Sequence, residues 1–158
     1  MSQNTLEKIR TFLTAAGVAF REVEHEPTRT SKESAAARGE DLNVGAKALL
    51  LKTDDMLRLF VLPADRKLDS GAIRRHLGVR KTRFATVEEL HDLIGLVPGA
   101  VPPFGKPILP FELYADESLS VATDKVAFNA GSLRNSIIMA ASDWERLAEP
   151  NRFRFAKD

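Results

Sequence analysis

The sequence predicts a mixed α/β fold in a single compact domain that spans residues 1–158. Three observations lead to this prediction. A length of 158 residues with 44% apolar and 28% charged residues is typical of one globular domain with its own core. Segments with helical periodicity alternate irregularly with segments of strand character, which indicates a mixed sheet packed against helices. No internal repeat and no low-complexity segment interrupts this pattern.

In the first quarter of the chain, a helix, a strand and a second helix are expected in turn. Apolar residues at helical spacing predict an amphipathic helix over residues 6–16. A short strand over 18–23 ends near His25, because the proline two residues later disfavours helical backbone before it. Thr30 then opens a capping box for a helix over 31–38. His25 in the connecting loop is interpreted either as a turn or surface residue or as a catalytic group.

Two strands joined by a tight turn, over 46–53 and 57–62, are expected to form the central hairpin. Side chains alternate between the two faces of a strand, so Lys47 and Lys52 project from opposite faces. Lys47 lies at the start of its strand, where an ammonium that enters a cavity needs an anion or hydrogen bonds. Lys47 is therefore a site candidate. The alternative is a lysine that lies along the sheet edge with its head in water.

A basic segment follows the hairpin and contains a helix between the cap Asp69 and Gly78. Residues 66–83 hold seven basic residues and one acidic residue, a local charge of +6, whereas the whole chain carries +1. This concentration is expected of a surface that meets phosphates. The alternative is a solvated helix face. The candidate nucleic-acid contacts in this segment are Arg74, Arg75, Arg80 and Lys81.

A stiff loop over residues 95–105 follows a helix that a capping box of Thr86 and Glu89 opens. That helix is expected to bury Val87, Leu90, Leu93 and Ile94. Six of the eleven loop positions are glycine or proline, so the loop should present its amides and carbonyls in one preset arrangement. Its interleaved apolar residues, Val97, Val101 and Phe104, should hold it against a core. The loop either holds a ligand or is a buried structural turn.

The last third of the chain is expected to be rich in strands. Extended segments are expected over 108–113, 119–123, 126–129 and 137–139, followed by a helix capped by Ser142 and a terminal strand through Phe153 and Phe155. A polar turn over 129–132 interrupts this pattern.

The sequence lacks the residues that several enzyme classes need. It contains no cysteine, which excludes thiol catalysis, disulfides and cysteine-bound metal. Its three histidines do not have the spacing of a zinc site, and no serine-hydrolase elbow, Walker loop or dinucleotide fingerprint is present. Apolar runs are too short to span a membrane and no signal peptide is recognisable. We therefore expect a soluble cytoplasmic protein without metal, cofactor or membrane contact.

Four motifs carry a resemblance over nearly the whole chain. They are His25-Glu26-Pro27-Thr28, the sequence GAKALLL over 45–51, the sequence GLVPG over 95–99 with Pro102-Pro103-Phe104-Gly105 after it, and Asn129-Ala130-Gly131-Ser132. In this order and spacing they resemble the YbaK family, also called the prolyl-tRNA synthetase associated editing domain family. The resemblance implies an α/β domain with a partly barrel-like sheet surrounded by helices. It also implies hydrolysis of mischarged aminoacyl-tRNA, here by a free-standing protein acting on mischarged tRNA-Pro or a similar small amino-acid error.

The resemblance implies roles for individual residues. Lys47 would lie near the aminoacyl ester or the terminal adenosine, and the Gly99 amide would stabilise an oxyanion. Asn129 lies in the region where some editing relatives have a histidine, so a hydroxyl of the terminal ribose is expected to assist the attack. Substrate contacts are expected from His25, Thr28, Gly95, Pro98, Pro102, Phe104, Gly131 and Ser132, and tRNA contacts from Arg74, Arg75, Arg80 and Lys81.

Two functions remain open at this point. The first is a trans-editing aminoacyl-tRNA deacylase, with aminoacyl-tRNA as substrate and an aminoacyl-tRNA synthetase as a candidate partner. The alternative is a non-catalytic module of the same fold that binds tRNA, a synthetase or an amino-acid derivative. Lys47 together with the complete glycine-proline loop favours the hydrolase, because a pure binding module would not need both.

Overall fold

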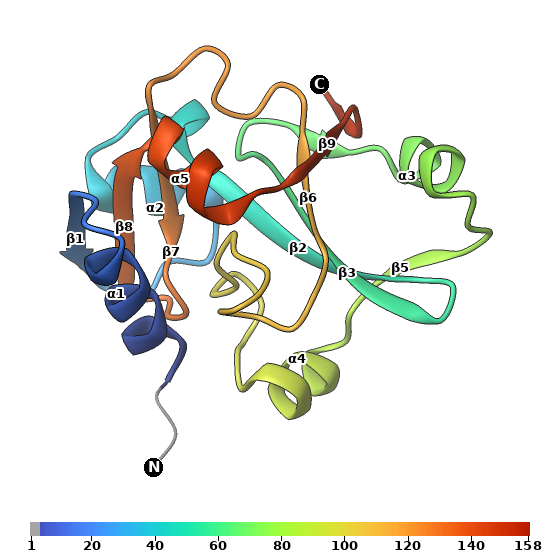
Figure 1. The fold of residues 1–158 in the computed structure, drawn as a ribbon, viewed down its shortest axis with the longest axis horizontal. Helices are drawn as coiled ribbons and strands as arrows, with labels where there is room; N and C mark the ends of the chain where they lie inside the picture. The colour runs from blue at the N-terminus through green and yellow to red at the C-terminus, as the bar shows by residue number, and fades with distance from the viewer. Residues whose placement is uncertain (1–3) are drawn as a thin grey trace.

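The computed structural model describes residues 4–158 (Figure 1). The helices are α1 (Thr5–Ala15), α2 (Ser31–Arg38), α3 (Ser70–Leu77), α4 (Val87–Ile94) and α5 (Ala141–Ala148), with one 3-10 turn, η1 (Leu42–Val44). The strands are β1 (Phe20–Glu24), β2 (Ala46–Thr53), β3 (Met56–Pro63), β4 (Lys67–Leu68), β5 (Thr82–Phe84), β6 (Leu113–Asp116), β7 (Lys125–Asn129), β8 (Asn135–Ala140), β9 (Asn151–Phe153) and β10 (Ala156–Lys157). Their alternation along the chain confirms the mixed α/β class.

Two sheets organise these elements. The larger sheet has the order β5-β2-β3-β6-β9, in which β2 is antiparallel to β3 and β5 whereas β6 is parallel to β3 and β9. The smaller sheet, β1-β8-β7, is antiparallel, and β10 pairs with β4. A bridge between Gly45 and Ala127 joins the start of β2 to β7. The five-stranded sheet is therefore mixed, as predicted, but it is not closed into a barrel.

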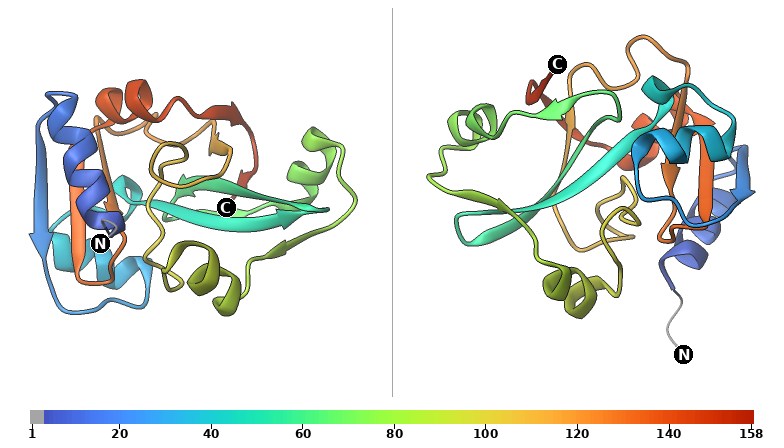
Figure 2. Two further views of the ribbon diagram at one scale, coloured as in Figure 1. Left: turned by 60° about the horizontal axis from the view of Figure 1, so that its bottom comes forward. Right: turned by 180° about the vertical axis from the view of Figure 1, so that it is seen from behind.

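Helices α1 and α2 cover opposite faces of the three-stranded sheet (Figures 1 and 2). Side chains of β8 alternate between these faces: Ile137 and Met139 pack in the core that contains Ile9 of α1, whereas Ser136 contacts α2. Asn129 is the direct partner of Ser136 in the register of β7 and β8, and directly paired residues lie on the same face. The sheet thus presents two polar side chains to α2.

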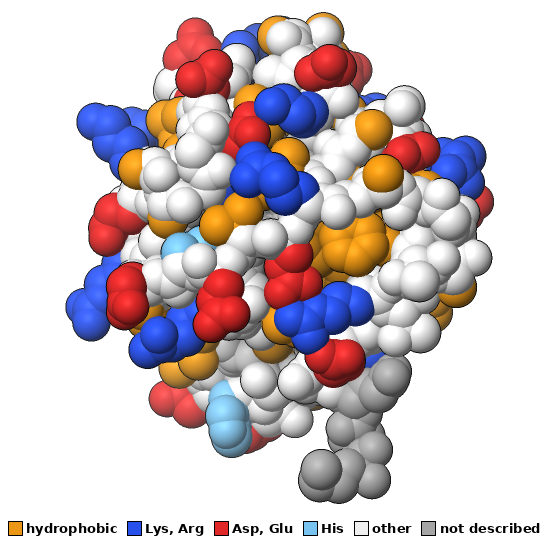
Figure 3. Space-filling view, turned by 90° about the vertical axis from the view of Figure 1, so that its left-hand side faces the viewer, with side chains coloured by type: hydrophobic (Ala, Val, Ile, Leu, Met, Phe, Trp, Pro, Cys, Tyr) orange, Lys and Arg blue, Asp and Glu red, His pale blue; other side chains and the backbone are white. Residues whose placement is uncertain are grey.

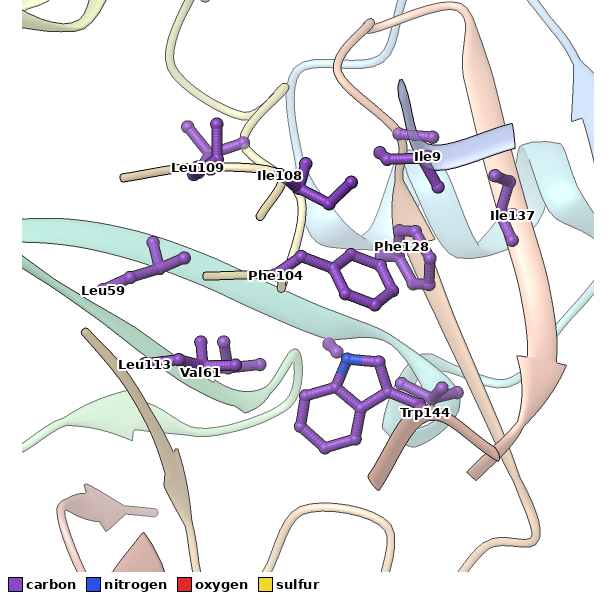
Figure 4. Packing of buried hydrophobic residues seen from close by; sticks show 14 of the residues in the cluster. Ile9, Leu59, Val61, Phe104, Ile108, Leu109, Leu113, Phe128, Ile137 and Trp144 are labelled. Carbon is purple, nitrogen blue, oxygen red and sulfur yellow. The ribbon is translucent and has the colours of Figure 1, made fainter. Parts of the chain in front are cut away.

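The glycine-proline loop is held between the two sheets. Phe104 is buried between residues of β3 and of the three-stranded sheet (Figure 4), with ring centroids 6.0 Å from Phe12 and 5.5 Å from Phe128. The Trp144 indole N–H donates a hydrogen bond of 2.9 Å to the Pro103 carbonyl. Burial of Val101 and Phe104 confirms that the loop is held against the core, whereas Val97 is 46% exposed and was wrongly included.

Local signals located most elements up to residue 95, although the strand expected over 18–23 is β1 over Phe20–Glu24. Strand β2 has the predicted bounds. The predicted caps also hold: Thr30, Asp69 and Thr86 accept hydrogen bonds at the starts of α2, α3 and α4. These three helices end at glycines of positive φ, which are Gly39, Gly78 and Gly95.

Two strand predictions in the second half were wrong. Residues 108–111 form a turn followed by bends, and β6 begins only at Leu113. The amides of Ile108 and Leu109 both donate to the Gly105 carbonyl, at 2.9 and 3.0 Å. Residues 119–123 also turn, since Leu119 donates to the Asp116 carbonyl at 3.1 Å. The chain satisfies these amides locally instead of through a sheet.

Three further predictions, for α4, α5 and the terminal strand, differ from the structure. Helix α4 buries Leu90, but Val87 and Leu93 are 57% and 53% exposed, so its buried stripe is narrower than predicted. Helix α5 begins at Ala141, and its N-cap residue is Ala140, which provides no side-chain hydrogen bond. Ser142, the predicted cap, therefore lies within the helix. The single terminal strand is two short strands, with Phe155 between them.

Candidate functional site

A cleft of about 310 Å³ lies where α2, the start of β2, the glycine-proline loop and the end of β7 meet. Its lining includes Thr28, Lys47, Pro98, Gly99 and Asn129, all predicted site residues, together with Ser34 and Arg38. None of the described residues that line it is acidic, and none is a histidine. The structure therefore brings together five predicted residues from four distant segments in an uncharged or cationic environment.

Gly45 allows these segments to meet. A Cβ atom at this position would lie 3.0 Å from the Ala64 Cβ and 3.2 Å from the Leu42 carbonyl oxygen, which is closer than nearly all real contacts of this kind. Its absence lets the start of β2 approach the turn after β3, while Gly45 itself bridges to Ala127 of β7. The position of Lys47, two residues later, follows from this close approach.

Lys47 is half-buried at the cleft. Its ammonium donates a hydrogen bond to the Arg66 carbonyl. Burial lowers its pKa from the ordinary 10.5, Asp65 opposes this change, and Lys67 adds to it. Lys47 shares its strand face with Leu49 and Leu51, as predicted from the alternation. It is thus a partly desolvated cation held by a neutral acceptor, which leaves its charge available to an anionic or carbonyl oxygen.

Arg38, which the sequence analysis did not select, holds the opposite side of the cleft. It is 6% exposed, and it donates to the Asn129 Oδ1 at 2.9 Å and to the Ser136 Oγ at 3.1 Å. Burial lowers the pKa of its guanidinium to about 10, while Glu40 acts in the opposite direction. The only sequence signal was an arginine in the last turn of an alanine-rich helix, which is usually a solvated residue at a helix C-terminus.

A chain of hydrogen bonds continues from Arg38 to the loop. Because Arg38 occupies the Asn129 carbonyl oxygen, the amide group of Asn129 points to the loop and donates to the Gly99 carbonyl at 2.8 Å. Gly99 has φ of +88°, a region that other residues rarely adopt. Within residues 4–158, no hydrogen bond uses the Gly99 N–H. The relay of Arg38, Asn129 and Gly99 therefore fixes the loop backbone beside a free amide.

His25 lies behind this relay and not in the cleft lining. Its Nδ1 is 2.8 Å from the Glu26 carbonyl oxygen and its Nε2 is 2.9 Å from the Ser136 Oγ. Ser136 in turn lies 3.3 Å from the Asn129 Oδ1. His25 is thus separated from Asn129 by one hydroxyl group, and a direct substrate contact for it stays a prediction.

Five further predicted site residues lie outside the cleft lining. Pro102 and Phe104 belong to the loop itself and are buried in the core. Gly95, Gly131 and Ser132 line a second, larger cavity of about 900 Å³, between the start of α1 and residues 106–110. This larger cavity contains none of the catalytic candidates. We therefore take the smaller cleft as the candidate site, because Arg38, Lys47 and Gly99 line it.

The predicted tRNA contacts lie at the far end of β2 from Lys47 (Figure 1). The amides of Arg80 and Lys81 donate to the Asp54 carboxylate at the tip of the hairpin, at 3.0 and 2.9 Å. At ~3.3 Å per strand residue, this tip is roughly 20 Å from Lys47. Arg74 and Lys81 line one depression there and Arg75 lines another.

The face of the molecule on the side away from α3 has no concentration of positive charge comparable to that of Arg74, Arg75, Arg80 and Lys81. Acidic and basic side chains alternate across it (Figure 3). In the part of the chain that the structure describes, no three metal-ligating side chains gather at one place. Among helices of residues 4–158, none combines the length and apolar character needed to cross a bilayer.

Comparison with known proteins identifies the family of this chain. The family model of the aminoacyl-tRNA editing domain matches residues 25–147. The chain is 34% identical over 158 residues to the multifunctional Ser/Thr-tRNA deacylase ProXp-y of Escherichia coli (strain K12), an alignment that covers 97% of this chain and 93% of that protein. It is 35% identical over 88 residues to the proline–tRNA ligase of Shouchella clausii, which covers 56% of this chain and 15% of the ligase.

A solved structure extends the agreement to the whole fold. The chain superimposes with a TM-score of 0.83 and 26% identity on the crystal structure of a candidate trans-editing enzyme for prolyl tRNA synthetase, over 100% of both chains. The motifs that first indicated the YbaK family thus lie in a fold and a sequence context that match this family throughout. The chain belongs to the aminoacyl-tRNA editing domain family.

Proposed function

We propose that this protein is a trans-editing aminoacyl-tRNA deacylase, which hydrolyses the ester between a wrong amino acid and its tRNA. The observation that carries the proposal is the cleft, whose described lining contains Lys47 and Gly99 and no acidic side chain. Within residues 4–158, the Gly99 N–H has no hydrogen-bond partner. A hydrolase of esters needs donors for the oxyanion, and a site for a tRNA terminus needs cations for phosphate. The cleft offers both.

Electrostatics favour an anionic substrate. Arg29, Arg38 and Lys47 line the cleft, and the backbone amides at the start of α2 point to its Thr30–Ser31 edge, where the helix dipole also favours negative charge. Lys47 is suited to the terminal phosphate or the ester carbonyl, because the Arg66 group that accepts its hydrogen bond is a neutral backbone carbonyl. The Arg38 guanidinium is committed to Asn129 and Ser136, so we assign it to positioning.

The chemical step follows from the groups that are present. A water oxygen attacks the ester carbonyl carbon, the Gly99 N–H stabilises the resulting oxyanion, and the bond from that carbon to the ribose oxygen breaks. The proton lost by the water passes to the leaving ribose oxygen. Since no histidine or carboxylate lines the cleft among the described residues, the neighbouring ribose hydroxyl of the substrate orients the water and relays this proton.

The comparisons support action in trans and a small acyl group. The alignment spans nearly the whole of the E. coli deacylase but a small fraction of the ligase. We therefore regard residues 1–158 as one editing domain that acts in the cytoplasm on tRNA charged by a synthetase, with that synthetase as a candidate partner. The named activity of the E. coli relative directs attention to seryl and threonyl esters.

The experiment that tests the function is hydrolysis of a panel of aminoacyl-tRNAs under single-turnover conditions. We expect the protein to release seryl or threonyl groups from mischarged tRNA, also in the presence of EDTA. A protein that binds these tRNAs without releasing any amino acid would instead be the binding module. A substrate whose free hydroxyl beside the ester is replaced by hydrogen should bind normally and react far more slowly; normal turnover would require a protein base.

A further inference from the structure

Two hydroxyl groups lie against each other in the wall of the cleft. The Thr28 Oγ1 and the Ser34 Oγ are 2.7 Å apart, and each residue is 6% exposed. Backbone hydrogen bonds hold both residues in place: the Thr28 N–H donates to the Leu133 carbonyl at 3.3 Å, and the Ser34 N–H donates to the Thr30 carbonyl at 3.0 Å. The position of the pair is therefore set by the backbone before a substrate arrives.

The pair has unused hydrogen-bonding capacity. Two hydroxyls carry two O–H donors and four acceptor lone pairs. One donor is used between them, and within residues 4–158 the second O–H has no further acceptor. A buried donor without an acceptor is unfavourable, so a polar group that enters the cleft beside Thr28 and Ser34 gains a hydrogen bond there.

The other polar side chains of the cleft either lack a free acceptor or, like Thr30 and Ser31, are not buried. Lys47 and Arg38 only donate, and the Asn129 Oδ1 already accepts from Arg38 and Ser136, so Asn129 can only donate to a ligand. Thr30 is exposed and serves the start of α2, where it contacts Glu33. The hydroxyl pair is therefore the buried group of the cleft that can both donate to and accept from a ligand hydroxyl.

We propose that Thr28 and Ser34 read the side-chain hydroxyl of the acyl group, and so select seryl and threonyl esters over alanyl and glycyl esters. This inference rests on the proposed deacylase function and adds to it the residues that decide the substrate class. A site that hydrogen-bonds a substrate hydroxyl discriminates strongly against an analogue without it, because the polar groups of the site are then left unpaired. Apolar residues of the lining, such as Val101, cannot discriminate in this way.

The test compares esters on one tRNA. The kcat/KM is measured for seryl-tRNA and alanyl-tRNA with the wild type, Thr28→Val and Ser34→Ala. Valine keeps the shape of threonine and alanine is favourable within a helix, so both variants should fold, which circular dichroism and melting curves verify. We expect the wild type to prefer the seryl ester and each variant to lower the seryl-to-alanyl ratio at least about tenfold.

Thr28→Ser is the matched control, because it keeps the hydroxyl and should keep the ratio near the wild-type value. Ratios that stay unchanged in both Thr28→Val and Ser34→Ala, including an equal fall of both rates, would overturn the assignment of the hydroxyl pair while leaving the deacylase function intact. A wild type that hydrolyses none of the esters would overturn the proposed function, and this assignment with it.

Discussion

The cleft and the basic end of the molecule both gather positive charge, but they hold it in different ways. In the cleft, Arg38 and Lys47 are partly or fully buried, and each donates to a neutral acceptor with a defined direction. At the basic end, by which we mean Arg74, Arg75, Arg80 and Lys81, the side chains are exposed. Exposed charges attract phosphates with little directional preference, and their effect is screened by salt.

This difference predicts that the cleft serves the chemical step and the basic end serves affinity for tRNA. Desolvated groups with fixed partners set distances and angles, which catalysis requires. Exposed charges instead raise the local concentration of a polyanion and increase its association rate. Substitutions in the cleft should therefore change kcat, and substitutions at the basic end should change KM and its dependence on salt.

The largest effect is expected for Gly99→Val. A Cβ atom at this position would lie 3.3 Å from the Leu133 Cδ2, and the φ of +88° strains any β-branched residue. The loop amide would be displaced, so we expect kcat to fall about 100-fold or more. Gly78→Val is the control, since Gly78 also has positive φ (+67°) but ends α3, away from the cleft. Equal loss of activity per folded molecule in both variants would contradict a specific role for the Gly99 amide.

The next largest effect is expected for Lys47→Ala. Loss of the cleft ammonium should lower kcat/KM at least about tenfold while the fold is retained. Lys52→Ala is matched in strand and chemistry, but Lys52 projects from the opposite face toward the basic end, where it lines a depression with Arg74 and Lys81. It should leave kcat unchanged. Equal losses of kcat in the two variants would exclude Lys47 from the chemistry.

A pH profile sharpens this prediction. Burial lowers the pKa of Lys47, so the ammonium is lost at a lower pH than that of an exposed lysine. After subtraction of spontaneous ester hydrolysis, wild-type activity should fall as pH rises through this pKa, below 10.5. The residual activity of Lys47→Ala should lack this alkaline fall. The same alkaline fall in both proteins would assign it to another group.

A smaller effect is expected for Arg38→Lys, which keeps the charge but cannot reach Asn129 and Ser136 together. The Asn129 amide would lose its fixed orientation, and kcat should fall about fivefold with little change in KM for tRNA. Arg21→Lys is the control, because Arg21 is an exposed partner of Glu40 on the same side of the molecule. A purely structural role for Arg38 would lower the melting temperature and leave kcat per folded molecule unaltered.

The smallest effect is expected at the basic end. Changing both Arg74 and Arg75 to Glu should raise KM for tRNA about threefold at low salt, reduce the salt dependence of binding and leave kcat unchanged. Changing Arg21 and Arg146 to Glu alters the net charge equally at exposed sites elsewhere. If the two double variants bind tRNA equally well at every salt concentration, the basic end is a solvated face without a role in tRNA binding.

Sequence patterns were sufficient where the determining interactions are local. Thr30 and Gly39 bound α2 as predicted because a cap is decided within one turn of helix. The separation of Lys47 from Lys52 follows from the two-residue period of a strand. The strand predictions over 108–113 and 119–123 failed because apolar composition does not reveal that Gly105 and Asp116 capture the following amides in turns.

By itself, the sequence determined the mixed α/β class, the bounds of the capped helices and the family, and it selected Lys47 and the glycine-proline loop as site candidates. Only the tertiary structure showed which of two cavities gathers Lys47, Gly99 and Asn129, and that Arg38 joins them there. Arg38 lies 91 and 98 residues along the chain from its partners Asn129 and Ser136. Its burial depends on how α2 packs on β7 and β8, and no local pattern records that packing, because a buried arginine and a solvated one have the same sequence neighbours.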